Sequence, residues 1–212
     1  MRTFVLAAIM LLLCPVVAFA GISSDAFEFT GKSKTTHGNG AVAGTGVSVT
    51  EYGDGILHET TFALSDVDLA LTDETGTIAY VGLKIYDFPE GAIMIIGVTA
   101  DLAMTKSSDG VNADWDGDFS LGTVTASNND TLTSTEDDIL PSTATPQASE
   151  GVTTATGQST AGENVVFDGT TTAKDLYLNF LVDDADHDVD STACNLIANG
   201  SITVLWYNLG NY

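Results

Sequence analysis

Short apolar and polar runs, separated by clusters of Gly, Asn and Asp, recur along most of this chain. Val47-Ser48-Val49-Thr50 and Ile202-Thr203-Val204-Leu205-Trp206 alternate with the period of two that is typical of a half-buried strand. Ile93-Met94-Ile95-Ile96 is a continuous apolar run, which is typical of a strand buried on both faces. After residue 20, no segment sustains a helical period over three turns. The pattern therefore predicts an all-β protein.

Eight segments carry this strand pattern. They are residues 46–52, 57–64, 78–86, 92–104, 119–125, 164–167, 176–182 and 201–209. Tyr52-Gly53-Asp54-Gly55 is a tight-turn signal between two of them, and Phe88-Pro89-Glu90-Gly91 separates another pair. About eight to ten strands with few helices are typical of a β-sandwich or a jelly roll.

Residues 126–163 differ from the rest because Thr, Ser, Ala, Asn, Asp and Glu dominate them and large apolar residues are scarce. The segment predicts either a long exposed loop or an insertion that reaches over a neighbouring subunit. A structureless stretch of this length is unusual inside a compact domain, so we expect contacts with another chain to order part of it. Residues 21–40 are small and polar and predict a flexible arm. Residues 41–212 then form a single β-sandwich domain with a polar insertion.

The first 20 residues have the layout of a secretory signal peptide. A short positive start is followed by an apolar run from residue 4 to residue 19, and Ala18-Phe19-Ala20 precedes Gly21 as a cleavage site. The run is shorter than the roughly 20 residues of a membrane span, so no stable span is expected. Two alternatives are a retained apolar arm and lipidation at Cys14. After cleavage Cys194 would be the sole cysteine, which excludes an intramolecular disulfide.

Charge narrows the choice of partners. The chain has 29 acidic residues against 6 Lys and Arg, for a net charge of −23. Such a surface repels phosphate backbones, which argues against direct nucleic-acid binding. Two explanations of the acidity remain open: solubility, including life in salty water, and the binding of cations.

Alternating carboxylates form the first candidate cation site. Asp114, Asp116 and Asp118 have a spacing that can wrap a hard cation such as Ca²⁺. The segment departs from an EF-hand loop, because Phe119 stands where the loop needs Gly and Thr125 stands where it needs Glu. A solvated acidic loop is the alternative interpretation.

A second candidate lies in residues 183–190, where five acids and one His occupy eight positions. Asp183, Asp184 and Asp186 are its candidate Ca²⁺ ligands. Carboxylates this close repel one another unless they are solvated or neutralised. The cluster therefore predicts either a solvated loop or a bound cation.

Catalytic motifs are missing from the sequence. His37, His58 and His187 lie in a polar arm, a predicted strand and an acidic loop. There is no Gly-x-Ser-x-Gly elbow, no His-Glu-x-x-His helix and no Gly-rich phosphate loop followed by a helix. We therefore expect no enzyme activity, no catalytic residues and no certain cofactor.

Three stretches carry a resemblance to a known group of proteins. They are residues 44–55 with His58 and Thr60, residues 84–91, and residues 119–123 together with 173–179 and 200–206. Together they resemble small β-rich, mostly uncharacterised proteins encoded among the virion genes of tailed and marine phages. The resemblance spans about residues 41–209. It implies a head or decoration-type structural protein that assembles with copies of itself on a capsid.

The sequence thus favours a self-associating structural protein on the surface of a virion, with its own copies or a capsid lattice as partners. The alternative is an exported cell-surface or extracellular-matrix β-protein, cleaved between Ala20 and Gly21, with Ca²⁺ held by residues 109–118 or 183–190. A secreted carbohydrate-binding module or hydrolase is a third, weaker hypothesis. A cleaved signal peptide has no obvious use on a protein that is assembled in a host cytoplasm. If residues 1–20 are instead a retained apolar arm that docks on a capsid, the apolar start agrees with a location on a virion.

Overall fold

A computed structural model describes residues 40–41, 46–53, 56–73, 78–127, 131–159, 165–183 and 194–210. All of them lie in the compact unit Lys34–Tyr212. The predicted signal-like segment and nearly all of the predicted N-terminal arm lie outside the described residues. No helix in the part of the chain described here is long and apolar enough to cross a membrane.

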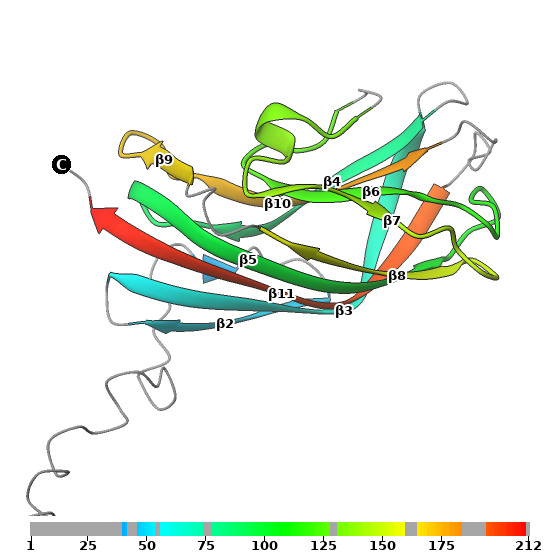
Figure 1. Ribbon diagram of the computed structural model, residues 1–212, viewed down its shortest axis with the longest axis horizontal. Coiled ribbons are helices and arrows are strands. Elements are labelled where there is room, and N and C mark those ends of the chain that lie inside the picture. The colour runs from blue at the N-terminus through cyan, green and yellow to red at the C-terminus, as the bar shows by residue number, and fades with distance from the viewer. Residues whose placement is uncertain are drawn as a thin grey trace, which may run out of the picture. The chain divides into compact units, whose positions relative to one another are not determined.

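The described residues form eleven strands and one short 3₁₀ helix, η2, at Ser134–Glu136 (Figure 1). The strands are β1 Gly40–Ala41, β2 Val47–Gly53, β3 Leu57–Asp73, β4 Ile78–Asp87, β5 Gly91–Lys106, β6 Gly117–Gly122, β7 Leu140–Thr145, β8 Val152–Gln158, β9 Val165–Gly169, β10 Asp175–Asp183 and β11 Cys194–Gly210. Each of the eight predicted strands overlaps one of these. The all-β prediction is confirmed.

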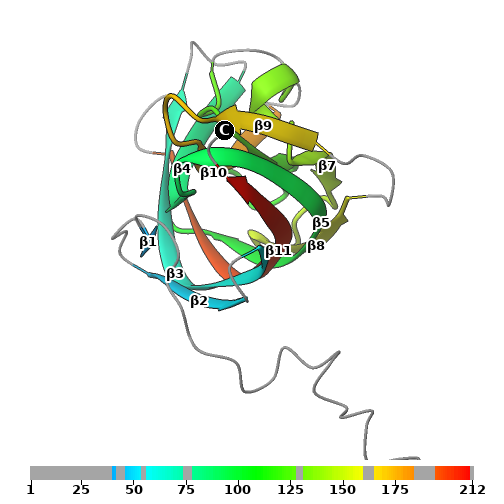
Figure 2. The ribbon, with the colours of Figure 1, turned by 90° about the vertical axis from the view of Figure 1, so that its left-hand side faces the viewer.

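Every strand pair is antiparallel, and the pairs form two layers. Sheet A contains β2, β3, β11, β5, β8 and β9, whereas sheet B contains β1, β4, β10, β6 and β7. Strand β3 joins them, because Thr72 and Asp73 at its end pair with β4. The sheet curls until β7 and β8, at the two ends of the strand order, contact each other (Figure 2). This curled antiparallel architecture agrees with the predicted β-sandwich or jelly-roll class.

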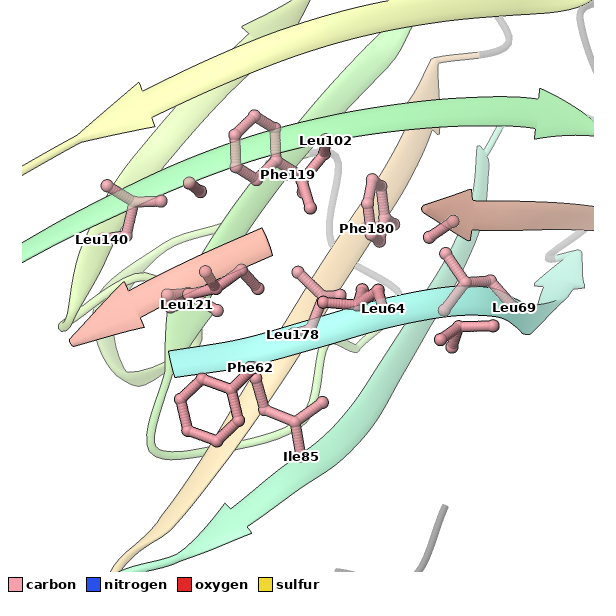
Figure 3. Close-up of a cluster of buried hydrophobic side chains, with 14 of the residues drawn as sticks. Phe62, Leu64, Leu69, Ile85, Leu102, Phe119, Leu121, Leu140, Leu178 and Phe180 are labelled. Atoms are coloured by element: carbon pink, nitrogen blue, oxygen red, sulfur yellow. The ribbon is translucent and has the colours of Figure 1, made fainter. Parts of the chain in front are cut away.

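One continuous core fills the space between the layers (Figure 3). Phe62 and Leu102 point into it from sheet A, and Phe119, Leu178 and Phe180 point into it from sheet B. Burying one such side chain stabilises the fold by about 1.5–3 kcal/mol. The alternation seen in the sequence therefore has its cause in two half-buried sheets that face each other.

Strand β3 is longer than predicted because a β-bulge interrupts its alternation. Phe62 and Leu64 are buried, but the next buried residue is Val67, so the inward phase shifts by one position. At the shift Asp66 has a φ of 51°, and its amide donates to Asn199 Oδ1 at 2.9 Å. The prediction ended the strand at residue 64 because a bulge and a turn interrupt alternation in the same way.

Residues 126–163, predicted as a polar loop or insertion, supply two strands of the sheet. Strand β7 pairs with β6, and β8 pairs with β5. Leu140, Ala148 and Ala155 belong to the main core, so contacts within this chain order the described part. In β8 the buried positions hold Thr153, Ala155 and Gly157. Because these residues are small or polar, the strand lacks an apolar pattern that a sequence analysis could detect.

Candidate functional site

Three titratable side chains meet inside the molecule, one each from β2, β3 and β4. His58 Nδ1 lies 2.9 Å from Glu51 Oε1, and the Tyr86 hydroxyl donates to Glu51 Oε2 at 2.6 Å. Glu51 is 4% exposed, and His58 and Tyr86 are 0% exposed. The cluster therefore links three strands through one carboxylate.

Aromatic rings enclose this cluster. The His58 ring stacks on Trp206 with a centroid distance of 4.1 Å, and the edge of Phe88 meets Trp206 at 5.2 Å. Trp206 Nε1 donates to Thr60 Oγ1 at 2.9 Å. Burial, aided by the hydrogen bond to Glu51, raises the pKa of the Tyr86 phenol far above its usual range. Tyr86 is therefore a neutral donor at any physiological pH.

Glu, His and Tyr are residue types that serve in acid–base catalysis, but a catalytic group must come within hydrogen-bond distance of its substrate. With at most 4% exposure, none of Glu51, His58 and Tyr86 has that access in this conformation. A buried hydrogen-bonded network of this kind instead favours one specific arrangement of the strands. The geometry assigns the cluster to joining the β2–β3 hairpin of sheet A to β4 of sheet B.

In the sequence, His58 lies within a predicted strand, far from the other two histidines. The signal that could have located the cluster is the hairpin register, in which Gly53 pairs with His58 and Glu51 pairs with Thr60. Those pairs place Glu51 and His58 on the inward face as diagonal neighbours. No local pattern pointed to Tyr86, because its strand is distant in sequence.

The first predicted cation site is only partly assembled. Asp116 and Asp118 line a hollow of about 250 Å³ at the β6–β7 pair, together with Thr145, whereas Asp114 is exposed. Within the described ranges, no group of three His, Cys, Asp or Glu side chains is placed to hold a metal ion. Ca²⁺ binding at this loop stays a prediction.

The second predicted cation site is nearly all outside the described residues. Asp183 ends β10, where its backbone pairs with Ile78. Asp184 and Asp186 lie outside the described residues, as do His37 and His187. The prediction of a site in this loop is untested.

Residues 123–127 and 131–139 lie over the middle of the outer face of sheet B, and we call them the covering segment. Its anchor is Asn179 on β10, which is 0% exposed. Asn179 Nδ2 donates to the carbonyls of Val124 at 3.0 Å and Glu136 at 2.7 Å, and its Oδ1 accepts from the Ala126 amide at 2.8 Å. One buried amide side chain thus satisfies three backbone groups of the covering segment.

Further contacts close the covering segment onto sheet B. The Ser120 hydroxyl donates to the Glu136 carbonyl at 2.7 Å. Leu132 and Ala126 pack against Leu181 in a second, small apolar cluster. Figure 1 shows η2 on the outer side of sheet B, where it contacts β6. The middle of this outer face, around Asn179 and Ser120, is consequently buried by the chain itself.

The outer face of sheet A carries side chains in rows that cross its strands. One row contains Thr50, Thr61, Thr203 and Thr99 in register, and Gln158 continues it on β8. The hydroxyl oxygens of Thr61 and Thr203 lie 3.2 Å apart. All five residues are exposed or half-exposed.

Three more rows flank the threonines. One contains Ser48, Ala63, Ser201, Asp101 and Thr156. On the other side lie Tyr52, Glu59, Leu205 and Gly97, and then an apolar row of Leu57, Tyr207, Met94 and Val166. We call these four rows the uncovered face. Every residue in it is exposed or half-exposed.

A hollow of about 290 Å³ opens on the uncovered face. It lies where β5 changes partner from β8 to β9 and where a bulge sets Ile96 and Gly97 opposite Leu205. Its walls include Thr203, Leu205 and Gln158. A Cβ atom added to Gly97 would meet no atom within 4 Å, so this position opens into the hollow.

The fold places the chain in the class of curled, antiparallel β-sandwich proteins. No protein-family model matches it, and no curated protein matches it at a significant level. It is similar to a chain of the solved structure described as "Structure of infectious bursal disease virus Gt strain", with a TM-score of 0.38 and 13% sequence identity. The alignment covers 77% of this chain and 34% of that chain, so this chain spans about a third of the other's length. A similarity at this score carries no argument about function.

Proposed function

We propose that this chain is a non-enzymatic structural protein that works by assembling with copies of itself. The observation that carries the proposal is the closed Glu51–His58–Tyr86 cluster. Among the described residues, Glu51, His58 and Tyr86 are bonded to one another across three strands, and solvent does not reach them. A stiff two-sheet body with one continuous core is suited to a mechanical role.

The surface of a virion is the proposed location. The resemblance of residues 84–91 and 200–206 to head and decoration-type phage proteins supports it. The acidic exterior of a chain with a net charge of −23 would keep particles from clumping. Direct nucleic-acid binding is not expected, since one of the few cations, Lys84, lies 2.5 Å from Asp175 Oδ1.

Quantitative mass spectrometry of purified particles and of particle-free medium tests this function. We expect the chain in many copies per particle, with a peptide from residues 1–20 still attached. Purified protein should also show no hydrolysis of polysaccharides or esters. A chain that begins at Gly21 and occurs only in medium or cell-surface fractions would overturn the virion location, and turnover abolished by one carboxylate substitution would overturn the non-enzymatic role.

An exported surface protein is the second candidate. The signal-like residues 1–20 favour it, as does the hollow that Asp116 and Asp118 share. If Ca²⁺ binds there, millimolar CaCl₂ will raise the melting temperature, since a ligand of the folded state stabilises it by mass action. The double substitution Asp116→Asn and Asp118→Asn should abolish that shift, and an equal shift in both proteins would exclude this site.

A further inference from the structure

We infer that the uncovered face is the surface through which one copy of this chain binds a second copy. The inference rests on the proposed self-assembly and adds the surface that performs it. The occupant follows from the charge of the face, from its area and from the contrast with the other outer face.

Charge restricts which surfaces of two copies can meet. Each copy carries a net charge of −23, so surfaces rich in carboxylates repel each other. The four rows of the uncovered face contain only two carboxylates, Glu59 and Asp101, and no Lys or Arg. A cationic partner would be drawn to the acidic surfaces elsewhere. With two carboxylates, the face has a net charge of −2 on a chain of −23, so a second copy that approaches it meets little repulsion.

The area is sufficient for a specific contact. The 18 residues of the four rows, each taking about 4.8 Å across the strands and about 6.6 Å along them, cover roughly 570 Å². Two copies would therefore bury roughly 1,100 Å², just above the roughly 1,000 Å² that a specific interface needs. Ser, Thr and Ala side chains along the central rows are short, so two such sheets can approach to about 10 Å, the usual separation of stacked sheets.

The apolar row and the hollow supply the anchoring part of the contact. Tyr207 and Met94 are half-exposed in the apolar row, and Val166 is 55% exposed at its end. The adjoining hollow of about 290 Å³ has room for one large side chain. Large aromatic side chains seated in pockets account for most of the binding energy at many interfaces. A second copy placed face to face would bring its own apolar row toward this hollow.

The outer face of sheet B is less accessible to a second copy. The covering segment occupies it, and the anchor Asn179 is fully buried beneath that segment. Docking a second copy there would require breaking the three hydrogen bonds of Asn179. A second copy can therefore reach the uncovered face as it stands, whereas direct contact with the middle of sheet B requires rearrangement.

A matched pair of serine substitutions tests the inference on the full-length protein. Ser201→Glu adds a charge to an exposed position of the uncovered face, and Ser142→Glu adds the same charge to an exposed position of β7. Sedimentation equilibrium should show dimers or larger assemblies for the parent and for Ser142→Glu. Like charges apposed across an interface cost several kcal/mol, so Ser201→Glu should raise the dissociation constant roughly tenfold or more.

A second variant controls for the possibility that association is lost because the protein misfolds. Gly97→Trp fills the hollow without a backbone conflict, because its Cβ would meet open space. It should weaken association while leaving the melting temperature within about 2 °C of the parent, since surface substitutions usually change stability little. Raising NaCl from low to physiological concentration should strengthen association, because salt screens repulsion between the acidic copies.

The outcomes separate this inference from the function it rests on. Assembly by Ser201→Glu and Gly97→Trp as strong as that of the parent would overturn the assigned face and leave self-assembly standing. A parent that remains monomeric at the highest soluble concentration would overturn the inference. Absence of the chain from purified particles would in addition remove the virion location.

Discussion

Polar side chains are buried on one outer face of this sandwich and remain half-exposed on the other. On sheet B, Asn179 and Ser120 are fully buried, and the covering segment satisfies their hydrogen bonds. On sheet A, Thr61 and Thr203 form a row that stays half-exposed. Residue polarity alone does not reveal which face a chain covers, because a buried amide with three partners and a hydrated hydroxyl are both stable solutions.

The largest expected effect comes from removing the anchor of the covered face. Asn179→Ala leaves the Val124 carbonyl and the Ala126 amide of the covering segment without their partner, whereas the Glu136 carbonyl still accepts from Ser120. Each buried group left unsatisfied costs about 1–3 kcal/mol, so we expect a loss of roughly 4 kcal/mol in the free energy of unfolding. Urea titration measures the loss. Limited proteolysis should also show earlier cleavage within residues 123–139, and unchanged cleavage would contradict the anchoring role.

A smaller effect is expected beneath sheet A, where Tyr86 is buried as a neutral donor. Its pKa in the folded state is raised by burial, so its contribution to stability is complete below about pH 10 and is lost as the pH rises further. Above that pH the parent should lose up to about 1.4 kcal/mol per pH unit through this group. Tyr86→Phe should lack that part of the slope in denaturant titrations at pH 9 to 11. Parallel slopes for the two proteins would rule out the assigned burial of the phenol.

The smallest effect is expected on the uncovered face. Thr203→Ala removes one hydroxyl from a half-exposed row in which water can replace it. Surface substitutions of this kind usually change stability by less than about 0.5 kcal/mol. Equal urea midpoints for the parent and the variant would show that the half-exposed hydroxyl, unlike the buried Asn179 amide, contributes little to stability. A loss as large as that of Asn179→Ala would show that the threonine row is structural.

The eight predicted strands were accessible from the sequence because large apolar residues alternate in them. Strands β7 and β8 were not, since Thr153, Ala155 and Gly157 occupy the inward positions of β8. Their place is decided by partners far away: Thr153 pairs with Met104, and Ala155 pairs with Leu102. Edge strands with small residues depend on such distant partners and leave little local signal.

The polar clusters also depend on partners that are distant in sequence. Asp116 and Asp118 line one hollow, as their spacing suggests, because residues two apart share a side of an extended chain. It did not bring Tyr86 to Glu51, or Asn179 to the covering segment. Those contacts join residues separated by 35 or more positions, and the sequence separation of such a pair gives no indication of it.

The position of β11 also decides when this protein can fold. Residues 194–210 lie between β3 and β5, and the register gives those two strands no direct pairing with each other. A ribosome must therefore produce nearly all 212 residues before the centre of sheet A can close. Until then β3 and β5 present unpaired edges, which are prone to aggregation. Chaperone demand during synthesis should accordingly be high, and deleting residues 194–210 should yield insoluble chain.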